Sequence, residues 1–259
     1  MTDRSSSMDR PEAPRGAQAL MRALDILDEI LLGPARSADL ARKLELSKTT
    51  THRLAHALMS RGYLTANRNG FTLGPKLLQL GTMAQAQTDY ARVARPFMET
   101  LSDQTGLCVF LGKRDGDWAL HLDRVIGRQK LRVSTAPGDR RTLAETGLGK
   151  ALLFDDDQAS LDHLYRLARG GTVPDAELEA WHERFAHYRE SGVVIHSSQT
   201  GDGIRSTAAP IRDAEGRIRL AICIASVAQY LNEDTMPAVA EQVKHTAERI
   251  SKAIGYDPR

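Results

Sequence analysis

The sequence predicts an α+β protein of two domains, in which a small helical module with a two-stranded wing precedes a domain built on an antiparallel sheet. Three observations support this. Two short helical segments lie about three residues apart near the N-terminus, and two short strand-like segments around an Asn-Gly pair follow them. Further along, runs of strand-like residues are interleaved with helical segments, which is typical of an antiparallel sheet with helices on one side. At 259 residues, the chain is long enough for two domains.

Composition favours an ordinary globular protein in a reducing cytoplasm. The chain is 41% hydrophobic and 26% charged, and no apolar run approaches the roughly 18 residues of a membrane helix. Residues 1–16 lack the apolar core of a signal peptide and are polar enough to be disordered. The cysteines Cys108 and Cys223 lie far apart, so neither a disulfide framework nor a cysteine-rich metal site is predicted. We expect no membrane contact, no metal and no cofactor.

Positive charge is concentrated in the N-terminal module. Residues 17–76 hold nine Lys and Arg against five Asp and Glu, whereas residues 77–259 hold 23 against 25. Such an asymmetry is expected where one part of a chain meets a phosphate backbone. Chance clustering of nine charges is not rare, so the asymmetry alone favours nucleic-acid binding only modestly.

The N-terminal module, residues 17–76, begins with three helices. Apolar residues at helical spacing predict the first, from Ala17 to the Gly33-Pro34 break. Ser37 is expected to cap a second helix over 38–44, and Ser47 a third that ends near Arg61. The second and third helices are spaced as in a helix-turn-helix, whose second helix enters the major groove of DNA.

The third helix has an apolar face that can pack against the first two helices and a polar face without carboxylates. The polar donors suit base edges and phosphates. Strands at 63–65 and 71–73 then predict a wing with Arg68 near its tip, able to reach a phosphate or the minor groove. A packing module without DNA contact, with these side chains merely solvated, is the alternative. The residues predicted to contact double-stranded DNA are Lys48, Thr49, Thr50, His52, Arg53 and Arg68.

A linker helix and the second domain follow. Residues 77–95 read as a linker helix that ends at Arg95-Pro96, and residues 96–259 as the second domain. Its strands are expected in 108–125, where two surround a turn at 115–117, and at 130–134, 193–196, 203–211 and 217–226. Its helices are expected at 148–154, 157–168, 175–191 and 235–254.

The chain resembles the IclR family of bacterial transcriptional regulators. The stretches RALDIL, SKTTTHRL, GYL and LGPKLLQLG carry the likeness in the first module, and it continues through the remaining chain. The resemblance implies a winged helix-turn-helix joined by the linker helix to a GAF/PAS-like effector-binding domain. It further implies a homodimer or dimer of dimers on an operator, a small-molecule effector, and by default repression of a neighbouring catabolic operon.

The resemblance also implies an effector site. The segment 146–151, TGLGKA, lacks the spacing and the Ser/Thr of a phosphate-binding loop, and reads as a glycine turn opening a helix. In the family the matching turn helps to bind the effector; a plain helix start packed on the sheet is the alternative. Where the family commonly has Cys, an acidic residue and Ser, this chain has Ser206, His196 and Cys223, so its ligand should differ. The predicted effector-binding residues are Phe110, Leu120, Val133, Thr146, Gly147, Leu148, His196, Ser206 and Cys223.

We expect the effector to be a small organic acid. Its carboxylate would meet the backbone N–H groups at 147–149, with Ser206 and His196 as further donors, although His196 could instead face solvent at a strand end. Replacement of an acidic residue by His196 removes a repulsive charge. If His196 must be protonated to help, affinity should fall as the pH rises through its pKa, nominally ~6.5.

Catalysis is not predicted. His121 and Asp123 would share one face of a strand, as a metal pair needs, but no further ligand lies at suitable spacing. Ser197 and Ser198, beside His196, lack the glycines that expose a nucleophilic serine. A small-molecule sensor or enzyme whose helix-turn-helix mediates only protein contacts remains the alternative to a DNA-binding regulator.

Overall fold

The computed structural model describes residues 17–198 and 203–258. The predicted disordered tail, residues 1–16, lies outside the described residues. The chain divides into two compact units between Thr88 and Asp89, and each unit has its own core. No described helix is both long enough and apolar enough to cross a membrane.

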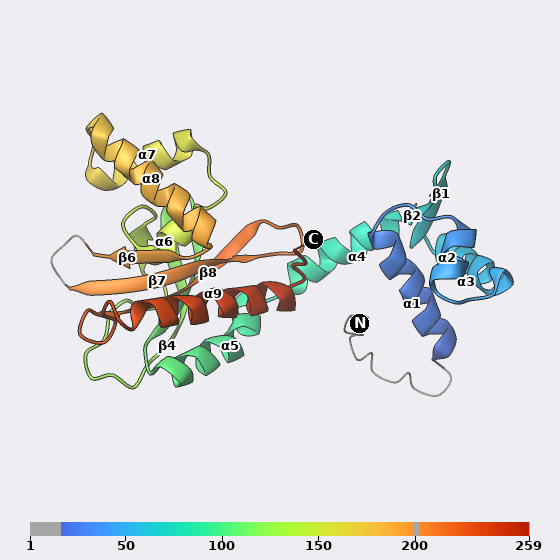
Figure 1. Ribbon diagram of the computed structural model, residues 1–259, viewed down its shortest axis with the longest axis horizontal. Coiled ribbons are helices and arrows are strands. Elements are labelled where there is room, and N and C mark those ends of the chain that lie inside the picture. The colour runs from blue at the N-terminus through green and yellow to red at the C-terminus, as the bar shows by residue number, and fades with distance from the viewer. Residues whose placement is uncertain (1–16, 199–202, 259) are drawn as a thin grey trace, which may run out of the picture. The chain divides into compact units, whose positions relative to one another are not determined.

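The N-terminal unit has the predicted order of three helices, hairpin and further helix (Figure 1). Its core gathers apolar side chains of the three helices and the first strand, including Ile26, Leu40, Ala55 and Leu64. The elements are α1 Gln18–Leu31, α2 Ser37–Lys43, α3 Lys48–Ser60, β1 Leu64–Asn67, β2 Gly70–Leu73 and α4 Pro75–Gln87.

Local hydrogen bonds decide where the helices of this unit begin. The predicted Ser47 cap is confirmed, because its hydroxyl accepts a hydrogen bond from the Thr50 backbone N–H at 3.1 Å. The predicted Ser37 cap is wrong: the cap position is Arg36, whose carbonyl accepts from the N–H groups of Asp39 and Leu40, so Ser37 is the first helical residue. The wing is fixed to the helices by paired backbone bonds between Ala35 and Phe71.

The linker helix ends earlier than the sequence predicts. α4 stops at Gln87, and α5 spans Tyr90–Thr105. Asp89 starts α5 by accepting a hydrogen bond from the Arg92 N–H at 3.1 Å. Pro96, expected to begin the second domain, lies inside α5. The expected end at Arg95-Pro96 is therefore wrong, because a capping aspartate breaks the helix and the proline only removes one backbone donor.

The C-terminal unit is built on a six-stranded sheet with the order β5-β4-β3-β8-β7-β6, in which every neighbouring pair is antiparallel. The α+β fold class and the antiparallel sheet are as predicted. After α5, the elements are β3 Val109–Asp115, β4 Trp118–Val125, β5 Arg140–Thr142, α6 Gly147–Ala151, α7 Gln158–Arg169, α8 Asp175–Ser191, β6 Val194–Ser197, β7 Ile204–Arg212, β8 Ile218–Val227 and α9 Met236–Ala253.

Helices cover both faces of this sheet, not one as expected. α5 and α9 pack against one face, while α6, α7 and α8 lie over the other (Figure 1). The strands are apolar on both sides: Val109 and Leu111 belong to the core beneath α9, and the intervening Phe110 belongs to the core beneath α6. A strand buried on both faces requires cover on both faces.

The strand expected at 130–134 is not formed. Its place beside β4 is taken by later residues, because the His121 N–H donates to the Asp139 carbonyl and Gly138 donates to the His121 carbonyl. β5 then continues this edge from Arg140. Residues 130–134 run outside the ladder instead, and part of this segment borders the cavity described next.

Candidate DNA-binding face and ligand pocket

The polar face of α3 is exposed as the helical periodicity predicts. Thr51 and Ala55 are fully buried against the other helices, whereas the side of the helix that carries Arg53 is open to solvent. The imidazoles of His52 and His56 lie on this side with ring centroids 4.2 Å apart. Lys48, Thr49, His52, Arg53 and Arg68 are exposed.

Two of the predicted DNA-contact residues have specific local settings. Thr50 is half-buried, and its hydroxyl accepts a hydrogen bond from Ser47 Oγ at 2.8 Å, so it belongs to the helix cap. Arg68 lies with Asn69 between the paired residues Asn67 and Gly70, at the tip of the wing.

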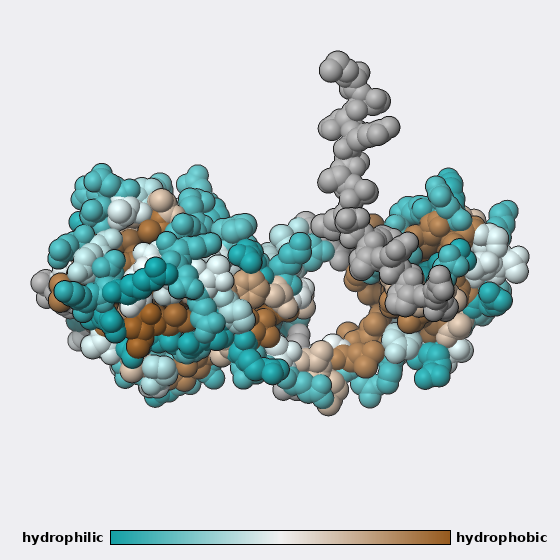
Figure 2. Space-filling model, turned by 90° about the horizontal axis from the view of Figure 1, so that it is seen from below, coloured by the Kyte–Doolittle hydropathy of each residue, from teal (hydrophilic) through white to brown (hydrophobic). Residues whose placement is uncertain are grey.

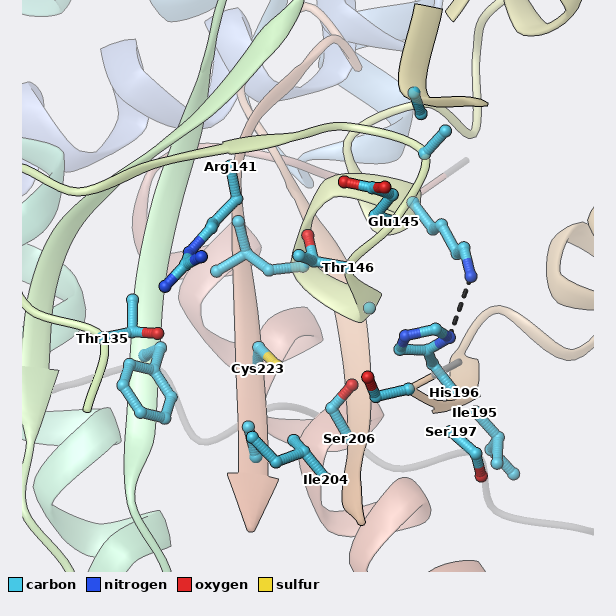
Figure 3. A pocket seen from close by; sticks show the side chains of 18 of the residues that line it. Thr135, Arg141, Glu145, Thr146, Ile195, His196, Ser197, Ile204, Ser206 and Cys223 are labelled. Atoms are coloured by element: carbon cyan, nitrogen blue, oxygen red, sulfur yellow. Dashed lines mark hydrogen bonds between the residues drawn. The ribbon is translucent and has the colours of Figure 1, made fainter. Parts of the chain in front are cut away.

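A cavity of about 670 Å³ lies between the sheet and the helices α6, α7 and α8. Figure 3 shows Arg141 and Thr135 on one side of it, His196 on the other, and Cys223 and Ser206 between them. Of the nine predicted effector-binding residues, eight line this cavity: Phe110, Val133, Thr146, Gly147, Leu148, His196, Ser206 and Cys223.

Leu120 is the exception, because strand alternation turns it away. Its neighbours Ala119 and His121 are buried toward the core beneath α6, and His121 lines the cavity in place of Leu120. A β-bulge leaves Leu122 unpaired, since Gly112 pairs with His121 and Leu111 with Asp123.

The bulge also separates His121 from Asp123, which the sequence placed on one face. Asp123 binds Arg95 of α5 with an Nη1–Oδ1 distance of 2.9 Å, on the opposite side of the sheet from the cavity. Within the described residues, no three His, Cys, Asp or Glu side chains are grouped so that they could hold a metal ion.

The glycine turn fits against the sheet without spare room. A Cβ on Gly147 would lie 2.4 Å from Ser206 Oγ, so a larger residue would have to displace the Ser206 hydroxyl. Thr146 Oγ1 accepts a hydrogen bond from the Gly149 N–H at 3.0 Å, and the Leu148 N–H and the Ser206 hydroxyl contact the Cys223 thiol. Burial raises the pKa of Cys223 to about 12, against the effect of these donors, so it is a neutral thiol.

These bonds change the expected role of the turn. The N–H groups of Gly149 and Leu148 already have partners, and α6 has only five residues. The turn therefore shapes the wall of the cavity and leaves little of the donor capacity expected for a carboxylate.

Lys150 is one of the lining residues that the sequence did not predict, and it is the buried cation among them. Lys150 is only 7% exposed, and its Nζ lies 2.9 Å from Nδ1 of His196, a bond that Figure 3 draws as a dashed line ending on His196. The same Nζ lies 5.6 Å from the centre of the Trp181 ring. Burial, reinforced by the charges of Arg184 and Arg169, lowers the pKa of Lys150 to about 8, while Glu145 opposes this shift. The available signal was a lysine one residue after the glycine turn of an otherwise apolar helix.

Cations outnumber carboxylates around the cavity. Arg141, Lys150, Arg169 and Arg184 line it together with a single carboxylate, Glu145. Arg169 is paired with Glu177, which lies outside the lining. This balance suits an anionic ligand.

Aromatic side chains and two polar atoms complete the lining. Nδ1 of His121 and Nε1 of Trp181 are buried and have no hydrogen-bond partner among the described residues. Burial lowers the pKa of His121, and Arg141 acts in the same direction against Asp139. The cavity thus combines positive charge, unused hydrogen-bonding atoms and apolar walls, as small-molecule sites do.

A winged helix-turn-helix unit and a separate unit whose cavity combines cationic, polar and apolar side chains define a class, the ligand-responsive DNA-binding regulators. Family models agree: the IclR helix-turn-helix domain matches residues 19–68, and the C-terminal domain of the bacterial transcriptional regulator IclR matches residues 82–252. This chain belongs to the IclR family of transcriptional regulators.

Similar proteins cover nearly the whole chain. The HTH-type transcriptional regulator XynR of Escherichia coli K12 is 28% identical over 246 residues, 92% of this chain and 98% of XynR. The HTH-type transcriptional repressor AllR of Salmonella typhimurium is 29% identical over 255 residues, 96% of this chain and 94% of AllR. The crystal structure of Pseudomonas aeruginosa HmgR has the same fold, with a TM-score of 0.79 and 22% identity over 95% of this chain and all of HmgR.

Proposed function

We propose that this chain is a cytoplasmic repressor of a neighbouring catabolic operon, and that a small organic acid bound in the cavity controls its hold on DNA. The main support for an acid is the composition of the cavity lining, which contains four cationic side chains and a single carboxylate. The name of AllR, a transcriptional repressor, supports repression as the default. An acid of drug-like size fits a cavity of about 670 Å³.

The DNA contacts that we propose follow from exposure. Lys48, Thr49, His52 and Arg53 are available to the major groove, Thr50 contributes from the helix cap, and Arg68 can reach a phosphate or the minor groove. One such module buries little surface on DNA, so specific binding needs at least two copies of the chain on one operator.

Self-association as a homodimer or dimer of dimers has support in the N-terminal unit, where large apolar side chains remain exposed on α1 and α4. Figure 2 shows hydrophobic side chains at the surface of this unit. A second copy of the chain could cover such a surface, which monomeric proteins seldom leave open. The side chains are Leu20, Leu24, Leu31 and Leu32 in and after α1, and Leu78, Leu80 and Met83 in α4.

The proposed function is tested by operator binding with and without acids. The full-length protein is titrated onto its own promoter region in gel-shift assays, with benzoate, hexanoate and succinate, each beside its amide. At least one acid should change the operator Kd tenfold or more while its amide does not. Equal effects of acids and amides would exclude an effector recognised by its carboxylate. No binding to the promoter region would exclude the proposed function as a repressor.

Arg53→Ala should weaken specific operator binding by about 1–3 kcal/mol if Arg53 contacts a base, and by less if it contacts a phosphate. Its exposed position on α3, one turn from Thr49, motivates the prediction. Arg68→Ala should instead weaken binding to all sequences similarly and reduce the salt dependence of the Kd. Fluorescence anisotropy on operator and unrelated DNA at several salt concentrations separates the two roles; an unchanged operator Kd for folded Arg53→Ala would remove Arg53 from the interface.

A further inference from the structure

In the cavity, the buried Lys150 is hydrogen-bonded to the half-buried His196. The ammonium of Lys150 carries three protons, and the one described bond of this group is to Nδ1 of His196. Among the described residues no carboxylate forms an ion pair with Lys150, although its side chain is almost wholly buried. Buried ammonium groups are normally paired with an anion, because their desolvation is costly.

We propose that Lys150, positioned by His196, binds the carboxylate of the effector, and that at alkaline pH the effector binds together with one proton. This inference rests on the proposed function and adds to it the residue that recognises the acid. It replaces the expected anchor at the glycine turn, where Thr146 and Cys223 already engage the N–H groups of Gly149 and Leu148.

His196 takes a different part from the one expected from the sequence. A protonated Lys150 can only donate, so Nδ1 of His196 must accept, and the imidazole then keeps its proton on Nε2. A protonated His196 would present a second positive charge at hydrogen-bond distance from the first. The pair therefore works with His196 neutral, holding the ammonium in place, and Lys150 supplies the charge.

The surroundings of Lys150 favour an anion as the missing partner. The positive charges of Arg184 and Arg169 disfavour the protonated form of Lys150, and the negative charge of Glu145 favours it. Glu145, however, is exposed and accepts a hydrogen bond from the Thr142 hydroxyl. Trp181 offers its ring to the ammonium and forms an apolar wall beside it. The other titratable or charged groups that line the cavity are His121, Arg141, Tyr165, Tyr188 and Cys223.

The sign of the pH effect follows from the pKa of Lys150, which is about 8 without ligand. A bound carboxylate favours the ammonium and raises this pKa. Below pH 8 the lysine is already protonated, so affinity is constant there; above pH 8 a proton must be taken up, and the Kd rises roughly tenfold per pH unit. His121 does not interfere, because burial lowers its pKa and keeps it neutral over this range.

Isothermal titration calorimetry of benzoate and of benzamide into the full-length protein tests the proposal. Buffers of different ionisation enthalpy report proton uptake, which should be near zero at pH 6.5, about one half at pH 8 and close to one at pH 9 for benzoate. It should be zero throughout for benzamide. Hexanoate and succinate, with their amides, extend the series if the aromatic ring does not fit.

Variants assign the effect to the pair. Lys150→Met should weaken benzoate binding at pH 7 at least tenfold and abolish proton uptake, whereas Lys113→Met, which removes an exposed lysine outside the cavity, should change neither. His196→Leu removes the acceptor, so it should weaken binding less and shift the pH midpoint below that of the wild type.

The outcomes distinguish the two proposals. Acid binding without proton uptake at pH 9, or undiminished in Lys150→Met, overturns the role of Lys150 and leaves the proposed acid effector standing. If the wild type binds none of the acids, both proposals fall. The pH profile of the wild type decides independently of how well any variant folds.

Discussion

Replacing Lys150 by methionine should raise the free energy of unfolding of the ligand-free protein by up to about 3 kcal/mol at pH 7. Burial lowers the pKa of this lysine from 10.5 to about 8, so below pH 8 the fold must hold a charge that the unfolded chain solvates freely. Methionine has a similar length without the charge. The residue that we propose to bind the effector thus weakens the unliganded fold.

The gain in stability should depend on pH in a defined sense. The penalty for holding a protonated Lys150 is fully present below pH 8 and shrinks as the pH rises from about 8 through 10.5, above which the amine is neutral in both states. Urea unfolding, followed by far-ultraviolet circular dichroism at pH 7, 9 and 10.5, measures this directly. Lys113→Met is the control, and a constant difference across the pH range would contradict the explanation.

Trp181→Ala should lower the free energy of unfolding of the C-terminal unit by about 3–5 kcal/mol. Trp181 is 1% exposed, stacks on Tyr165 with ring centroids 4.6 Å apart and meets Phe185 at 4.8 Å. Alanine would join the volume of the indole to the cavity and remove the ring beneath Lys150. The loss should therefore appear in unfolding and in ligand binding together.

Two further substitutions sharpen this test. Trp181→Phe keeps an aromatic wall and removes an indole N–H that has no partner among the described residues, so it should cost less than half as much. Trp118→Ala removes a side chain that is 41% exposed at the start of β4, and should cost under about 1 kcal/mol. Equal losses for Trp181→Ala and Trp118→Ala, measured by calorimetry of each unfolding transition, would refute the assignment of Trp181 to the core.

Much of the fold could be predicted because local patterns match local structure. The periodicity of α3, its Ser47 cap and the paired strands β7 and β8 needed no tertiary information. The errors arose where tertiary contacts chose between local options. Residues 130–134 have a strand-like composition, yet backbone bonds to His121 give the edge of the sheet to 138–142 instead.

The pocket was predicted less completely for the same reason. The resemblance to the family located eight lining residues, but strand alternation and a bulge decided between Leu120 and His121. The position of Lys150 after the glycine turn was only a weak signal, because a lysine in a helix is usually solvated and its burial beside Trp181 and His196 depends on tertiary contacts. Which side chains share one cavity depends on contacts between distant segments.

The break between α4 and α5 bears on how such proteins diversify. The Thr88 hydroxyl donates a hydrogen bond to the Ala84 carbonyl in α4, and the Asp89 carboxylate accepts one from the Arg92 N–H in α5. In the part of the chain that the structure describes, these side-chain bonds of Thr88 and Asp89 stay within their own units and each unit has its own core, so a gene exchange at this junction would leave both intact. A single recombination event there could join one DNA-binding unit to a different ligand-binding unit. The same boundary is suited to the construction of chimeric biosensors.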